Sequence, residues 1–162
     1  MAATVYLDTN VFIHAFEGAD ELSLALTNLF AVDTPQPAFA TSELTLAELL
    51  VHPYRHRNEA EQERYDSLIR PSAFLKVGPI DRSILMGAAL LRSSYRLKLP
   101  DAIHISTALH FGCELLLTGD RGLEGSFSLQ YQSTGQQWSS TVVHTVALDV
   151  QSVMAATEHI RT

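Results

Sequence analysis

Short apolar segments alternate along the chain with longer segments whose apolar residues recur at helical spacing, and no other feature limits the fold as strongly. The candidate strands are residues 4–7, 38–41, 73–77, 114–118 and 142–148, and candidate helices lie between them. This alternation is typical of parallel strands joined by crossover helices. We therefore predict an α/β fold, a three-layer α/β/α sandwich around a central, mainly parallel sheet.

Length and composition predict a single domain. The chain has 162 residues, of which 46% are hydrophobic, and this is enough to bury the core of one domain. We expect this domain to span residues 1–162, with its core in residues 4–125. Residues 126–141, rich in Ser and Gln, are expected to form a polar loop, and residues 142–162 a last strand and a C-terminal segment.

The sequence also favours a reducing compartment. Its first residues lack the charged flank and cleavage signature of a signal peptide, and no apolar run is long enough to span a bilayer. Cys113 is the only cysteine, which excludes an internal disulfide framework and a thiolate-rich zinc site. We expect a cytoplasmic protein without membrane contact, with Cys113 in the core.

The net charge of −7 argues against nucleic-acid binding through a general basic surface. Such binding depends on Lys and Arg side chains that neutralise phosphates. If the substrate is RNA, bound metal ions or a basic partner must supply the positive charge.

Four acidic residues occupy positions where their side chains can meet. Asp8 follows the first strand, Asp120 follows the fourth, Asp101 begins a helix, and Glu48 lies inside an otherwise apolar helix. In an open α/β sheet, ligands bind in the crevice outside the carboxyl ends of the strands, where Asp8 and Asp120 are expected. Glu48 can reach this crevice if its helix begins there.

Converging carboxylates imply a bound cation, because each would otherwise raise the pKa of its neighbours. Oxygen ligands without cysteine favour Mg²⁺ or Mn²⁺, and such ions support phosphodiester hydrolysis. Taken singly, Asp8 and Asp120 could be turn residues and Asp101 a helix cap. Glu48 is harder to explain in this way, because an acid among leucines must face outward or be paired.

At these positions the sequence resembles the PIN-domain nucleases, especially the VapC-type toxins of prokaryotic toxin–antitoxin pairs. The resemblance covers about residues 4–125 and rests on four blocks in order. These blocks are Leu7-Asp8-Thr9-Asn10-Val11, Thr45-Leu46-Ala47-Glu48, Leu99-Pro100-Asp101-Ala102 and Leu117-Thr118-Gly119-Asp120.

The resemblance implies a PIN-like fold and a Mg²⁺- or Mn²⁺-dependent endoribonuclease, the toxin of a type II pair. It implies that the four acids, Asp8, Glu48, Asp101 and Asp120, bind metal and activate water. It also implies a small cognate antitoxin, whose cationic side chain would block the acids, and a homodimer.

Within the same blocks, the resemblance suggests that Asn10 and Thr118 orient the acids or the substrate from a second shell.

Other polar residues are candidates for substrate contact. His104 lies one turn after Asp101, so it could carry a proton or contact phosphate, or be a hydrogen-bonded structural histidine. Arg55 and Arg57 lie in a cationic stretch, residues 52–57, that could contact RNA or be a solvated connection after the Glu48 helix. Arg121 could grip phosphate or be an exposed loop residue.

Three other functions remain open. The fold could serve a nuclease outside a toxin system, or survive as a binding module without activity. Phosphotransferases of the haloacid dehalogenase type also begin with an acid after the first strand, but their second acid is absent here, since Asn10 occupies that position.

Overall fold

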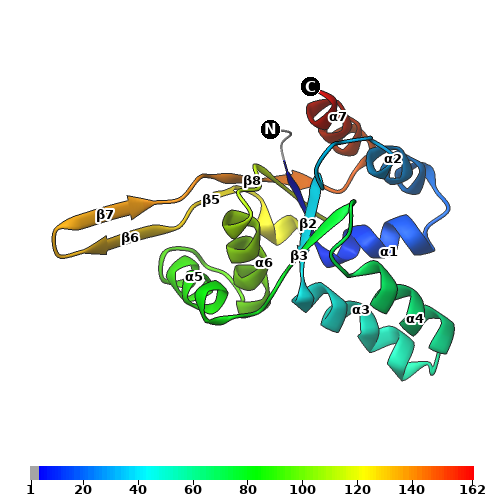
Figure 1. The fold of residues 1–162 in the computed structure, drawn as a ribbon, viewed down its shortest axis with the longest axis horizontal. Coiled ribbons are helices and arrows are strands. Elements are labelled where there is room, and N and C mark those ends of the chain that lie inside the picture. Colours follow the sequence, from blue (N-terminus) through cyan, green and yellow to red (C-terminus); the bar gives the residue numbers. More distant parts are fainter. Residues whose placement is uncertain (1–3) are drawn as a thin grey trace.

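A computed structural model describes residues 4–162 and shows a six-stranded sheet between two layers of helices (Figure 1). In chain order, the first elements are β1 (Val5–Leu7), α1 (Thr9–Glu17), α2 (Glu21–Phe30), β2 (Phe39–Ser42), α3 (Glu43–Arg55), α4 (Glu59–Leu68), β3 (Leu75–Gly78), α5 (Arg82–Ser94), α6 (Leu99–His110) and β4 (Leu115–Thr118). They are followed by a 3-10 helix, η1 (Arg121–Leu123), and by β5 (Ser126–Phe127), β6 (Gln130–Ser133), β7 (Gln136–Ser139), β8 (Val143–Ala147) and α7 (Val150–Arg161).

The sheet is parallel except for its last strand. Its order is β3-β2-β1-β4-β8-β5, and only β5 runs antiparallel to its neighbour β8. β1 therefore lies between β2 and β4, with Leu7 opposite Leu117. Because the three strands are parallel, their carboxyl ends meet at one edge, which we call the carboxyl edge.

Alternate residues of β1 contribute to two separate cores. Val5 and Leu7 belong to a cluster formed with α1, α2, α3, α4 and α7, whereas Tyr6 packs on the other face among residues of α5 and α6. This follows from the two-residue repeat of a strand, which sends neighbouring side chains to opposite faces. The predicted three-layer α/β/α sandwich with a mainly parallel sheet is confirmed.

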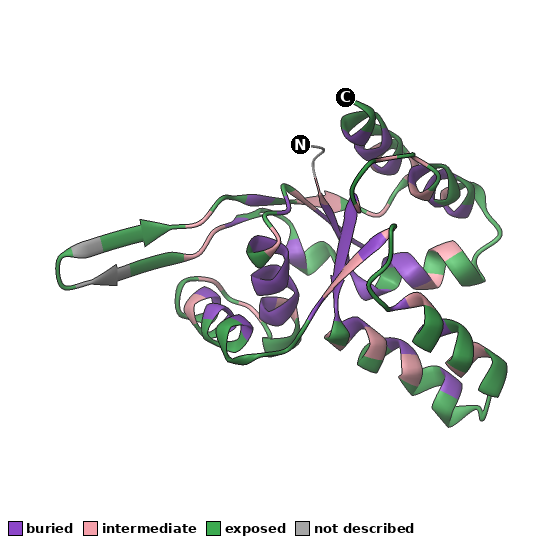
Figure 2. Ribbon diagram, viewed as in Figure 1, coloured by how far each residue is buried: buried purple, intermediate pink, exposed green. Residues whose placement is uncertain are grey.

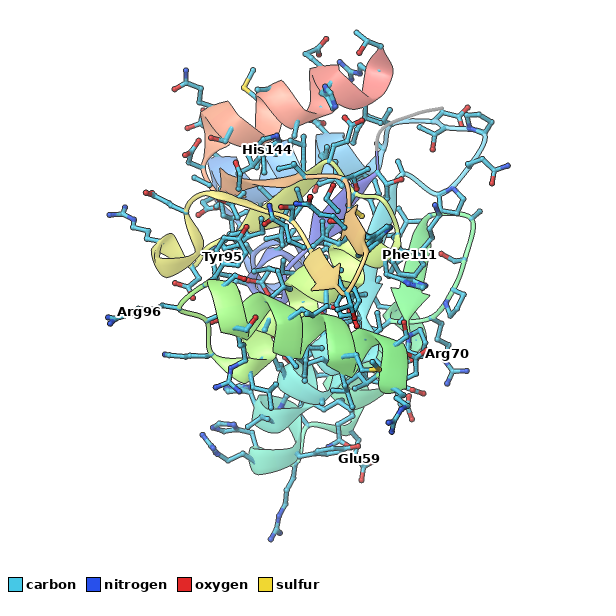
Figure 3. All side chains as sticks on the ribbon, turned by 90° about the vertical axis from the view of Figure 1, so that its left-hand side faces the viewer. Glu59, Arg70, Tyr95, Arg96, Phe111 and His144 are labelled. Carbon is cyan, nitrogen blue, oxygen red and sulfur yellow. The ribbon has the colours of Figure 1, made fainter. Side chains whose placement is uncertain are left out.

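Helix α6 is enclosed almost completely. Every residue from Ala102 to Leu109 is buried, because α6 lies between the sheet and α5 (Figure 2). Figure 3 shows α5 crossing the front of the molecule, with α7 at the top and α3 and α4 at the bottom. Polar groups on α6, such as His104, must therefore find partners inside the protein.

Residues 126–141 differ from the expected polar loop, since they contain three strands. β6 and β7 form a two-stranded hairpin, residues 130–139, that projects from the body (Figure 1), and we call it the arm. Thr134 and Gly135 make its two-residue turn, and Gly135 has a φ of 92°, a conformation that glycine adopts without strain. The prediction of a polar loop was wrong. Apolar alternation, on which it was based, does not reveal polar strands that are held by backbone hydrogen bonds.

Two smaller expectations concern single features. Cys113 is buried as expected, and burial raises the pKa of its thiol to about 12. Within residues 4–162, no helix is both long and apolar enough to cross a bilayer.

The core makes a prediction about two leucines of α2. Leu26 is fully buried, whereas Leu24 is 62% exposed on the same helix. We expect Leu26→Ala to lower the free energy of unfolding by about 2–5 kcal/mol, since it leaves a cavity. The matched control, Leu24→Ala, should change it by less than about 0.5 kcal/mol. Urea denaturation measures both, and equal losses would contradict the assignment of the core.

Candidate active site

Asp8 lies at the carboxyl end of β1 and caps α1. Its Oδ1 accepts a hydrogen bond from the amide of Thr9 at 2.7 Å, and its Oδ2 accepts one from the hydroxyl of Thr118 at 2.7 Å. Only 8% of the residue is exposed. The carboxylate is therefore held by its own helix and by the end of β4.

Asp120 follows β4, and Thr118 connects it to Asp8 by hydrogen bonds. The amide of Asp120 donates to Oγ1 of Thr118 at 3.0 Å, while this hydroxyl donates to Asp8. Oδ1 of Asp120 accepts from the amide of Gly122 at 2.8 Å and caps η1. One threonine hydroxyl thus binds the carboxylate of Asp8 and the backbone amide of Asp120.

Glu48 reaches the same edge from α3, which begins where β2 ends. Its Oε1 accepts from the hydroxyl of Thr9 at 2.9 Å and contacts Nε2 of His104 at 2.6 Å. Burial tends to raise the pKa of Glu48, but the hydrogen bonds from His104 and Thr9 lower it. The pKa of Glu48 therefore lies below its ordinary value, so the side chain stays ionised.

His104 lies between two of the acids and is only 2% exposed. Its Nε2 is 2.6 Å from Oε1 of Glu48 and 3.7 Å from Oδ1 of Asp8, and its Nδ1 is 2.6 Å from the hydroxyl of Tyr6. The sequence offers His104 as a proton carrier or a phosphate contact. The structure places the ring inside the protein instead, where both nitrogens face protein groups.

Asp101 is in the first turn of α6, one turn before His104. Burial raises the pKa of Asp101, and the negative charges of Asp120 and Asp8 raise it further, against a smaller opposite effect of Lys98. The charges of Asp120, which follows β4, and of Asp8, which follows β1, therefore act on Asp101 in α6.

The acids fit a divalent cation in their chemistry, although they do not enclose one. Within residues 4–162, no group of three or more His, Cys, Asp or Glu side chains is arranged to hold a metal ion. Hydrogen bonds from Thr9, Thr118 and His104 link the carboxylates instead. Besides burial, the charges of Asp120 and Asp8 raise the pKa of Asp101, and a hard cation would offset such charges.

The remaining candidates lie around or away from these acids. Asn10 is exposed, and a side-chain carbon built at Gly119 would lie 3.5 Å from its Nδ2, so Asn10 is close to the turn before Asp120. Arg121 follows Asp120 and is exposed.

Arg55 and Arg57 lie further from the acids. α3 continues to Arg55, so residues 52–55 are its last turn and not a separate connection. Arg55 is about 10 Å further along the helix axis than Glu48. Arg57 follows the helix and is exposed.

Sequence reasoning missed Tyr6 and Thr9. Tyr6 lies in an apolar strand, and a buried phenol needs a hydrogen-bond partner, so its hydroxyl was a sign of a polar contact inside the core. Thr9 stands next to Asp8, but nothing in the sequence indicates that its hydroxyl reaches Glu48.

The chain matches known proteins over most of its length. The sequence model of the family described as "PIN domain" matches residues 5–125. No curated protein sequence matches the chain.

Three solved structures resemble it. A toxin–antitoxin complex from Klebsiella pneumoniae has 29% identity and a TM-score of 0.56, over 72% of this chain and 87% of that one. VapBC2 from Rickettsia felis, bound to a DNA fragment from its promoter, has 21% identity and a TM-score of 0.54, over 72% and 88%. VapC20 of Mycobacterium tuberculosis, a sarcin-ricin loop cleaving toxin, has 16% identity and a TM-score of 0.57, over 70% and 87%.

The family match spans β1 to η1 and includes all four acids and the residues that link them. The parallel sheet and the carboxylates at its carboxyl edge agree with this match. The chain belongs to the PIN domain family.

Proposed function

We propose that this chain is a Mg²⁺- or Mn²⁺-dependent endoribonuclease and the toxin of a type II toxin–antitoxin pair. The observation that supports the proposal is that His104 contacts both Asp8 and Glu48, while Thr118 binds Asp8 and the amide of Asp120, at the carboxyl edge of a PIN domain. Structures of toxin–antitoxin proteins resemble the chain, and one of them is a toxin that cleaves the sarcin-ricin loop.

The four acids would hold the ion. When bound, a divalent cation polarises the phosphodiester and lowers the pKa of a water molecule. Thr118 donates to the carboxylate of Asp8, and the amide of Gly122 donates to that of Asp120. Thr9 and His104 fix one oxygen of Glu48. These bonds restrict the carboxylates before substrate arrives, so less ordering is needed for the reaction.

The net charge of −7 is consistent with partners that bring positive charge. RNA would approach together with cations, and an antitoxin would place a basic side chain among the carboxylates. A cytoplasmic location and a homodimer belong to the same proposal. The alternative is an active nuclease outside a toxin pair, which would have the same activity but no antitoxin.

The nuclease proposal predicts the effect of Asp8→Asn. We expect this change to reduce metal-dependent RNA cleavage by about a hundredfold or more, because a ligand charge is lost while the side chain keeps its shape. The matched control is Asp33→Asn, an exposed aspartate that contacts none of the four acids. Cleavage of structured and single-stranded RNA is measured with Mg²⁺, with Mn²⁺ and with chelator.

Cleavage that persists in chelator or in the Asp8→Asn variant would overturn the metal-dependent mechanism. A cell-based measurement separates the two partner roles, since expression of a toxin arrests growth and expression of its Asp8→Asn variant does not. Active protein whose expression leaves growth unchanged would support a nuclease outside a toxin pair.

The raised pKa of Asp101 predicts a pH-dependent gain in stability for Asp101→Asn. Because the folded protein favours the protonated acid, the ionised form destabilises the fold, and stability falls as the pH rises through this raised pKa. In chelator, the variant should therefore have a higher Tm than the wild type at pH 7.5. The difference should shrink towards pH 4, where Asp101 becomes protonated.

Thermal denaturation of both proteins at the two pH values provides the test. Adding Mn²⁺ at pH 7.5 should raise the Tm of the wild type more than that of the variant. A lower Tm of the variant in chelator at pH 7.5 would contradict the electrostatic repulsion at this edge.

A further inference from the structure

The ring of His104 is held between a buried phenol and a carboxylate. We infer that His104 is a positioning residue, which Tyr6 keeps in the Nε2–H tautomer so that it donates a hydrogen bond to Glu48. This inference deepens the proposed function where it concerns cleavage, whereas the tautomer itself is independent of that function.

The two neighbours of the ring determine where its proton lies. The ionised carboxylate of Glu48 can only accept, so Nε2, at 2.6 Å, must carry a hydrogen. In the neutral ring, Nδ1 is then an acceptor, and the hydroxyl of Tyr6, also at 2.6 Å, donates to it. Tyr6 is fully buried, and burial is the main reason that its pKa is raised, so the phenol keeps its proton.

Glu48 needs such a donor because its side chain is long and 39% exposed. The two donors that reach it, Thr9 on α1 and His104 on α6, both bind Oε1. Within the described residues no donor reaches Oε2, so this oxygen is left for a ligand. The arrangement therefore fixes the direction of one oxygen while it keeps the other available.

The contacts also join elements that are far apart in the sequence. Tyr6 belongs to β1, Glu48 to α3 and His104 to α6, and the ring is 2% exposed. Because α6 is enclosed by the sheet and α5, the ring cannot turn away from Glu48 without disturbing the core. A rigid ring of known tautomer is what a positioning role requires.

Two substitutions of His104 separate its two nitrogens. The amide nitrogen of Gln can occupy the place of Nε2 and still donate to Glu48, whereas the shorter Asn places its amide near Nδ1, beside Tyr6. We expect His104→Asn to reduce both RNA cleavage and Mn²⁺ affinity by about 10- to 100-fold. His104→Gln should stay within about threefold of the wild type in both. Circular dichroism and Tm establish that the two variants are folded.

The tautomer is measured directly by long-range ¹H–¹⁵N correlation spectra of the wild type in chelator. We expect a protonated Nε2 and a bare Nδ1 for His104, and loss of this uniform state in Tyr6→Phe. The Nδ1–H tautomer in the wild type, or equal losses of Mn²⁺ affinity in the Asn and Gln variants, would overturn the inference. Absence of cleavage in every protein, with the tautomer and the Mn²⁺ difference as expected, would instead refute the proposed nuclease.

Discussion

Negative side chains held at one edge of a sheet repel each other, and the donors around them determine which arrangement they keep. In this protein the donors are two threonine hydroxyls and one imidazole: Thr118 joins Asp8 to Asp120, and Thr9 and His104 hold Glu48. The parallel order of β2, β1 and β4 makes this possible, because it brings three strand ends together. Burial and, after it, the charges of Asp120 and Asp8 raise the pKa of Asp101 at this edge.

The layers of the fold and the location of the acids followed from patterns along the chain. Asp8 and Asp120 come directly after strands, and parallel strands must end at a common edge, so local sequence was sufficient to group them. Glu48 could be predicted as a site residue because an acid among leucines must face outward or be paired. The partner itself could not be predicted, since His104 is 56 residues away and its approach depends on how α3 and α6 pack.

The arm shows where patterns of apolar residues fail. Its strands consist mainly of Gln and Ser, and backbone hydrogen bonds between β6 and β7 define it. The same region lies beyond residues 5–125, so neither apolar alternation nor the match to the PIN domain family describes it. Backbone pairing of this kind becomes visible only in three dimensions.

The arm leaves and rejoins the sheet at adjacent points, since Phe127 in β5 is paired with Val143 in β8. The sheet therefore fixes both ends of the segment between these two residues. The length and sequence of this segment can therefore drift during evolution without displacing Asp120 or α7. Related proteins can then differ in what the arm contacts while the carboxylates at the carboxyl edge keep their arrangement.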